Sequence, residues 1–77
     1  MEYDKNKVDE VVLALLWLTT FREKSETRAW KGHSWEHLDR LFKKGLISNP
    51  KSKAKSVVVT KEGEKQSQEL FKKYFGV

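Results

Sequence analysis

The sequence contains no cysteine, only one proline and no long apolar segment. Without cysteine it can form neither a disulfide framework nor a thiolate metal site, and small secreted domains usually depend on such cross-links. We therefore expect a cytoplasmic protein. The longest apolar run, Val11 to Leu18, has eight residues, whereas a membrane span needs about 20. The sequence thus predicts no contact with a membrane.

The length and the charge limit the remaining possibilities. A chain of 77 residues allows one small domain, which we expect to span residues 1–77 and to leave little room for an enzyme. The net charge is +5 and is unevenly distributed, because residues 31–77 carry eleven Lys and Arg against five Asp and Glu. A basic half of this kind favours a polyanion as partner, although surface lysines also keep small proteins in solution.

The first predicted element is a helix from about Asp4 to Thr20, with Asp4 or Asn6 as its N-cap. It carries an apolar stripe at three- and four-residue spacing, formed by Val8, Val11, Val12, Leu15 and Leu18. Leu13, Leu16 and Trp17 fall outside this stripe, so the helix is apolar around most of its circumference and must be covered on two sides. Either Trp17 closes the core of one domain, or the Val8–Leu18 helix and Leu70–Phe75 form a homodimer interface.

A second and a third helix are expected before residue 46. The segment FREKSETRAWKGHSW is polar, and Ser25 is placed to cap a short helix that runs to Trp30 and stops at Gly32. Ser34 then caps a helix from Trp35 to Lys44, with Leu38, Leu41 and Phe42 directed inward and Gly45 ending it.

The rest of the chain predicts a hairpin and a final helix. Leu46–Ser48 and Ser56–Thr60 are expected to be strands on either side of a turn that begins at Asn49-Pro50. Thr60 is placed to cap a helix from Lys61 to Phe75. The sequence therefore predicts an α+β fold with three to four helices and a two-stranded hairpin.

This order of elements resembles the winged helix-turn-helix domain. The segment LDRLFKKGLI, Leu38 to Ile47, is similar to the recognition helix and first wing strand of small bacterial regulators of the multiple-antibiotic-resistance and phenolic-acid-repressor types. The segment VVVTKEG, Val57 to Gly63, is similar to their second wing strand and the start of the last helix. The run AWKGHSWEHLDRLFKKGLISNPKSKAKSV also resembles a family of short bacterial proteins of unknown function.

The resemblance implies a small DNA-binding protein, and a transcriptional regulator. Lys51, Lys53 and Lys55 would reach phosphates from the wing. Arg40, Lys43 and Lys44 would hold the adjacent backbone, and His37 would stand among the outward residues near the amino end of the recognition helix. In the alternative interpretation, the lysines only protect a hairpin edge from aggregation. The domain is then a non-catalytic protein-interaction module, which the acidic Glu36 and Asp39 on the same helix favour.

The segment HSWEH, His33 to His37, matches the H-x-x-E-H zinc-peptidase pattern. That chemistry requires both histidines on one continuous helix and a third ligand, whereas Gly32 and Ser34 place His33 in a turn. We expect no catalysis, no metal and no cofactor.

Trp30 and Trp35 stand on either side of this turn. Tryptophan contributes a large buried area to a small core, so we expect both rings to pack onto the first helix. The alternative is an exposed aromatic anchor for a protein partner.

Overall fold

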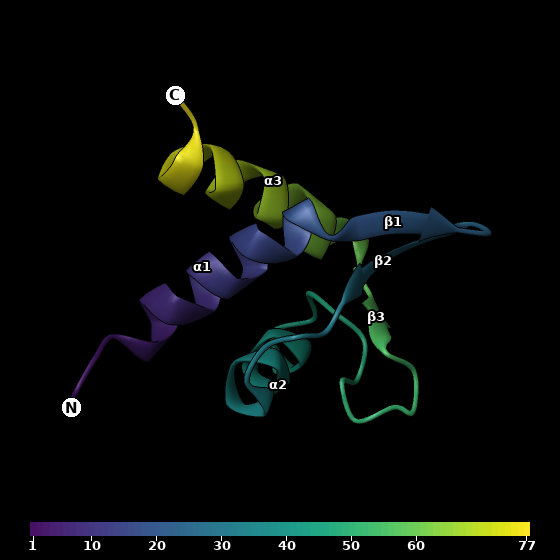
Figure 1. Cartoon of the computed structure of the whole chain (residues 1–77), viewed down its shortest axis with the longest axis horizontal. Coiled ribbons are helices and arrows are strands. Elements are labelled where there is room, and N and C mark those ends of the chain that lie inside the picture. The colour runs from purple at the N-terminus through teal and green to yellow at the C-terminus, as the bar shows by residue number, and fades with distance from the viewer.

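The computed structural model describes all 77 residues and contains three helices and a three-stranded antiparallel sheet (Figure 1). The α+β class is therefore confirmed. None of the three helices is both long and apolar enough to cross a lipid bilayer. Along the chain the elements are α1 (Lys5–Leu18), β1 (Thr20–Glu23), β2 (Glu26–Trp30), α2 (Trp35–Lys43), β3 (Ser56–Val58) and α3 (Lys61–Phe75).

Helix α1 begins where the sequence predicts, because the side chain of Asp4 accepts a hydrogen bond from the backbone N–H of Lys7 at 3.0 Å. Its buried face differs from the predicted stripe and consists of Asp9, Val12, Leu13, Ala14 and Leu16. The predicted stripe is wrong in that Leu18 is 65% exposed. The buried stripe starts at a charged residue, Asp9, and a hydrophobic pattern alone passes over such a residue.

The segment after α1 forms a β-hairpin, so the helix predicted from Ser25 to Trp30 is wrong. Strands β1 and β2 pair antiparallel, with Thr20 opposite Ala29 and Glu23 opposite Glu26. Thr27 and Ala29 are buried, whereas Glu26 and Trp30 are exposed. This alternation has the period of two that a strand requires, and five residues are too few to display it clearly among polar neighbours.

The two-stranded hairpin expected from residues 46–60 is not the one that forms. Strand β3 pairs with β2, with Arg28 opposite Val58, and the sheet order is β1-β2-β3. The segment Leu46–Ser48 pairs with the second expected strand at only one antiparallel bridge, between Ile47 and Val59. The ladder of β3 is completed by β2, a partner about 28 residues away that lies in the segment predicted to be helical.

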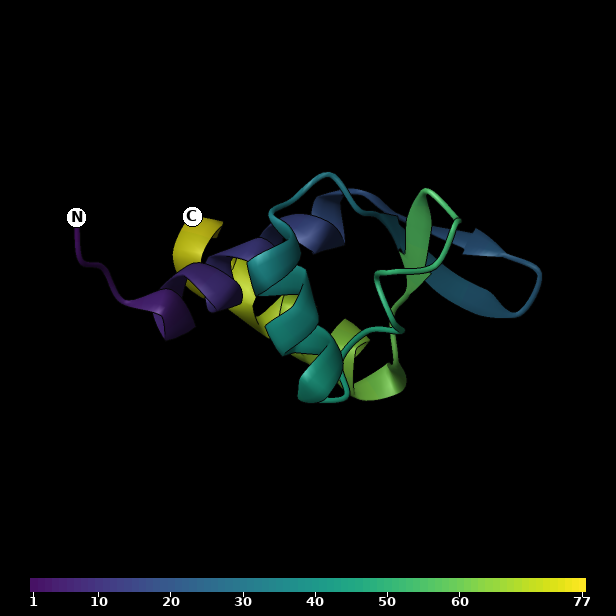
Figure 2. The ribbon, with the colours of Figure 1, turned by 90° about the horizontal axis from the view of Figure 1, so that it is seen from below.

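Helix α1 lies between α2 and α3, and the hairpin and the loop after α2 extend to the other side of the molecule (Figures 1 and 2). The Tyr74 hydroxyl donates to Oε2 of Glu10 at 2.5 Å and ties α3 to α1. The core brings together residues from α1, α2, strands β2 and β3, and the segments that follow α2 and β3: Val12, Leu13, Leu16, Ala29, Leu38, Leu41, Leu46, Ile47, Val57 and Val59. Leu70 of α3 is partly buried and packs against this cluster.

The bounds of α3 are those predicted, and the hydroxyl of Thr60 accepts from the backbone N–H of Gly63 at 3.0 Å. Helix α2 begins at Trp35 as predicted but ends at Lys43, one residue early. Gly45 follows with a φ of 76°, a left-handed conformation that glycine adopts without strain. Phe42, expected to point inward, is 38% exposed.

A test of this packing uses Gly63, where α3 meets the segment after α2. A Cβ at this position would overlap the backbone carbonyl of Leu46, although alanine normally favours a helix over glycine by about 1 kcal/mol. We expect Gly63→Ala to lower the free energy of unfolding by about 2 kcal/mol, since overpacking outweighs helix propensity. Chemical denaturation measures this change.

The matched control is Gly32→Ala, because an added Cβ at Gly32 meets nothing within 4 Å. We expect this control to change the unfolding free energy by less than about 0.5 kcal/mol. A stabilised Gly63→Ala variant would contradict the close approach of α3 to Leu46.

Candidate nucleic-acid interface

The structure separates the seven residues predicted to bind DNA into two groups. The first group lies on and just after α2 and engages carboxylates: His37, Arg40, Lys43 and Lys44. The second group, Lys51, Lys53 and Lys55, lies on the exposed loop between α2 and β3. The helix residues and the loop lysines therefore have different surroundings.

The first group is organised around Asp9, whose carboxylate is almost completely buried at 1% exposure. Arg40 donates to both of its oxygens, from Nε to Oδ2 at 2.5 Å and from Nη2 to Oδ1 at 3.0 Å. His37 Nδ1 lies 2.5 Å from Oδ1 and donates to it, because an ionised carboxylate can only accept. The ammonium group of Lys44 stands 4.0 Å from Oδ2. These contacts join α1 to α2.

Asp9 and Arg40 keep their charges in the folded protein. Burial acts to raise the pKa of Asp9, but the hydrogen bonds from Arg40 and His37 outweigh it and hold the pKa below its ordinary value. The pKa of Arg40 is raised by its hydrogen bonds to Asp9 and Glu36. A buried carboxylate is tolerated only when it is paired in this way. The Arg40 side chain is therefore engaged in stabilising the fold.

This arrangement corrects the expected orientation of His37. The helical position was expected to face outward, but His37 is 8% exposed and faces Asp9. The sequence contained a signal for it, since Asp9 falls at the correct spacing with Val12, Leu13 and Leu16, although the spacing does not reveal its partner. Lys43 pairs with Asp39 at 3.1 Å on the exposed side of α2.

The second group lies on a loop that is fastened at several points to the end of β2. The Lys31 ammonium group donates to the backbone carbonyls of Pro50 and Ser52, at 2.7 Å in each case. The backbone N–H of Lys31 donates to the carbonyl of Lys55 at 3.1 Å. Within the loop, the side chain of Asn49 accepts from the N–H of Lys51 at 3.0 Å. Lys31 therefore holds the loop near its start, at Pro50 and Ser52, and at its end, at Lys55.

The three loop lysines make no ion pair within the protein. Lys51, Lys53 and Lys55 are all exposed, and no carboxylate lies within 4.0 Å of their ammonium groups. The carboxylates of Glu36 and Asp39 border the same depression as Lys51. Both are neutralised by other cations, Glu36 by Lys5 and Arg40 and Asp39 by Lys43.

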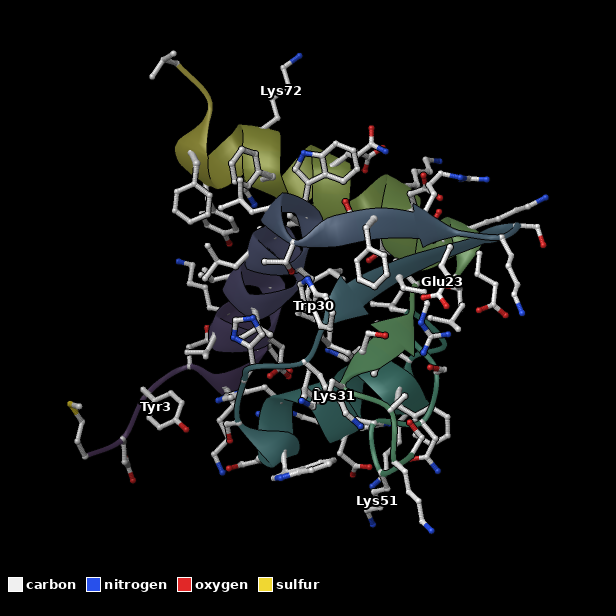
Figure 3. The ribbon with its side chains drawn as sticks, turned by 45° about the vertical axis from the view of Figure 1, so that its right-hand side comes forward. Tyr3, Glu23, Trp30, Lys31, Lys51 and Lys72 are labelled. Atoms are coloured by element: carbon white, nitrogen blue, oxygen red, sulfur yellow. The ribbon has the colours of Figure 1, made fainter.

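Two tryptophans beside the loop are exposed, so the packing onto α1 that the sequence predicts for them is wrong. Trp30 is 53% exposed and Trp35 is 57% exposed. The Trp30 ring stacks on Phe21, with 5.0 Å between ring centres, and Nζ of Lys31 lies 5.5 Å from the centre of the Trp35 ring. Figure 3 shows Trp30, Lys31 and Lys51 following one another from the end of β2 toward the loop.

The zinc-peptidase pattern is not assembled into a metal site. His33 lies in the segment before α2, and burial together with the nearby His37 lowers its pKa. His37 directs Nδ1 at Asp9. The structure contains no group of three or more His, Cys, Asp or Glu side chains placed to hold a metal ion.

The fold and this surface define a small α+β protein with an exposed lysine-rich loop. The chain belongs to the family described as "Domain of unknown function (DUF6429)", which matches residues 4–77. It is 51% identical over 75 residues to "Uncharacterized protein y4hR" of Sinorhizobium fredii (strain NBRC 101917 / NGR234), and 97% of each chain is covered. No solved structure matches the chain. The resemblance to a short bacterial family of unknown function is confirmed.

The Asp9 cluster yields a stability prediction. Asp9→Asn removes the charge but leaves Arg40 and His37 facing an amide, so we expect the free energy of unfolding at pH 7 to fall by about 3 kcal/mol. Asp39→Asn is the matched control, because that carboxylate pairs with Lys43 at the surface and is expected to contribute less than about 1 kcal/mol. Denaturant titration measures both.

Comparison of the native protein with Asp9→Asn also gives a prediction for the pH dependence of stability. The folded-state pKa of Asp9 is lowered, so its contribution is complete above an unfolded pKa of about 4 and is lost as the pH falls through the folded value. The difference between the native protein and Asp9→Asn should therefore shrink as the pH falls below the unfolded pKa of about 4. A difference that stays constant from pH 7 down would contradict an ionised Asp9 in the folded state.

Proposed function

We propose that this protein is a small, non-enzymatic DNA-binding protein that contacts the phosphate backbone through the loop from Asn49 to Lys55. The observation that carries the proposal is the set of three exposed, unpaired ammonium groups on one anchored loop. Sequence-independent affinity for DNA comes mainly from such contacts between lysine and phosphate.

The anchoring of the loop favours binding. Lys31 fastens the backbone at Pro50, Ser52 and Lys55, so the loop loses little conformational freedom when phosphates arrive. The ammonium group of Lys31 is itself held by neutral carbonyls rather than by a carboxylate. Its charge therefore adds to the positive potential of the loop.

Helix α2 is poorly placed to read base edges. A recognition helix offers donors and acceptors to base edges near its amino end. Here His37 and Arg40 are engaged with Asp9. We therefore propose a weak sequence preference, with the loop supplying the main contacts.

The salt dependence of binding tests the proposal. Each phosphate that a lysine neutralises steepens the fall of log K with log salt by about 0.9 on duplex DNA. We expect the triple variant Lys51→Ser, Lys53→Ser, Lys55→Ser to flatten this slope by about 2 to 3 and to weaken binding at low salt. Fluorescence anisotropy with a mixed-sequence duplex measures both quantities.

The control removes the same charge from elsewhere. Lys65, Lys72 and Lys73 are exposed on α3, and Lys72 lies at the opposite end of the molecule from Lys51 (Figure 3). Changing these three lysines to serine should leave most of the slope intact. Equal losses in both triple variants would show that net charge, and not the loop, determines binding.

We further propose that two copies associate through the solvent-facing side of α1. Val8, Val11 and Leu15 are only partly buried there and Leu18 is 65% exposed, while the opposite side of α1 is already covered by the core. These four side chains carry no charge, so a two-fold axis brings no like charges together across them. Phe75 at the end of α3 is a further exposed apolar residue, at 45%.

The assembly is tested by light scattering after size exclusion. We expect a mass near twice 9.1 kDa at high concentration, and Leu18→Lys should raise the dimer dissociation constant at least about tenfold, because a charge would be buried in the interface. Ser25→Lys, which adds the same charge on the exposed hairpin turn, should have no effect. A native protein that remains monomeric at all concentrations would remove the dimer.

A further inference from the structure

We infer that Trp30 and Trp35 form a platform on which unpaired bases stack, so that the preferred ligand is single-stranded nucleic acid. The inference rests on the proposed function, since the same loop lysines would hold the phosphates. It adds the chemical class of the ligand, which the lysines alone do not determine.

The geometry brings the two kinds of side chain together. Trp30, Lys31, Trp35, Lys53 and Lys55 line one shallow depression of about 500 Å³ at the surface. The indoles come from the end of β2 and the start of α2, and the lysines come from the loop and from the residue after β2. Proteins that bind single strands combine a positively charged groove with aromatic rings on which the bases stack.

Both rings are held in place and remain accessible. Phe21 packs against Trp30, with ring centres 5.0 Å apart, and the ammonium group of Lys31 lies over Trp35. More than half of each tryptophan is nevertheless exposed, at 53% and 57%. Two large, supported and exposed indoles on a small protein mark a binding surface.

The choice of single strands follows from what an indole can contact. In a duplex the faces of the bases are covered by their neighbours, and only the base edges and the backbone are accessible. An indole face pairs with a base face, which is free in an unpaired segment. The loop lysines would then follow the phosphates on one side of the stacked bases.

The positive charges that line the depression suit a single-stranded nucleic acid. The cations that line the depression, Lys31, Lys53 and Lys55, have no carboxylate within 4.0 Å. A polyanion that also carries aromatic rings would satisfy both the ammonium groups and the indoles. A nucleic acid with unpaired bases has this chemistry.

Three probes of equal length separate the contributions. They are an oligothymidylate of about 12 nucleotides, within the usual site sizes, an abasic strand with the same number of phosphates, and a mixed-sequence duplex. We expect the oligothymidylate to bind at least about tenfold more tightly than the abasic strand, and to quench tryptophan fluorescence on binding.

Paired substitutions separate stacking from folding. Trp30→Leu and Trp35→Leu should each weaken oligothymidylate binding about tenfold, the size expected for one lost stack, and should leave abasic-strand binding unchanged. Trp30→Phe and Trp35→Phe should retain most of the affinity, because phenylalanine keeps an aromatic face. Tyr3→Leu is the control, since Tyr3 is an exposed aromatic residue at 49% that lies apart from Trp30 (Figure 3).

The outcomes distinguish failure of the tryptophan platform from failure of the phosphate-binding loop. Equal affinity for the oligothymidylate and the abasic strand, or tighter binding to the duplex, would overturn the platform while leaving the phosphate-binding loop in place. Binding to none of the three probes at low salt would overturn the proposed function and the platform with it. That result, together with capture of a protein by the native surface but not by Trp35→Leu, would assign the indoles to a protein partner.

Discussion

The buried carboxylate of Asp9 is the interaction on which the rest of the arrangement depends. It accepts hydrogen bonds from Arg40 and His37, and these bonds link α1 to a helix about 30 residues later in the chain. A paired carboxylate at 1% exposure contributes little net stability against an apolar substitute, but removing one partner leaves a costly buried charge. The cluster therefore fixes the position of α2, and with it Trp35 at the start of that helix.

The position of the loop depends on a second polar residue, Lys31. It follows β2 directly, donates to two carbonyls of the loop and places its ammonium group over Trp35. A single side chain thus holds the loop, the end of the sheet and the first residue of α2 together. The free lysines of the loop can remain at the surface because the neutral carbonyls, rather than their own ammonium groups, provide the attachment.

The sequence predicted those features that depend on residues a few positions apart. The start of α1 near Asp4, the cap at Thr60, the bounds of α3 and the start of α2 all depend on residues within about four positions of one another. The hairpin of β1 and β2 was missed, because four- and five-residue strands rich in charge give almost no periodic signal. The pairing of β3 with β2 is not predictable for the same reason, since the segment of β2 carries the pattern of a short helix rather than of a strand.

The separation in sequence between interacting residues also explains why the surroundings of the candidate site residues could not be predicted. His37 and Arg40 were assigned to binding because charged helical residues usually face solvent, and no local pattern shows that Asp9 lies 28 and 31 residues away to receive them. Trp30 and Trp35 were assigned to the core because tryptophan is usually buried. The alternation of Thr27 and Ala29 inward instead directs Trp30 outward. His37 and Arg40 therefore stabilise the fold, because their partner Asp9 is distant in sequence but close in space. Trp30 lies at the surface, because the strand directs its side chain away from the core.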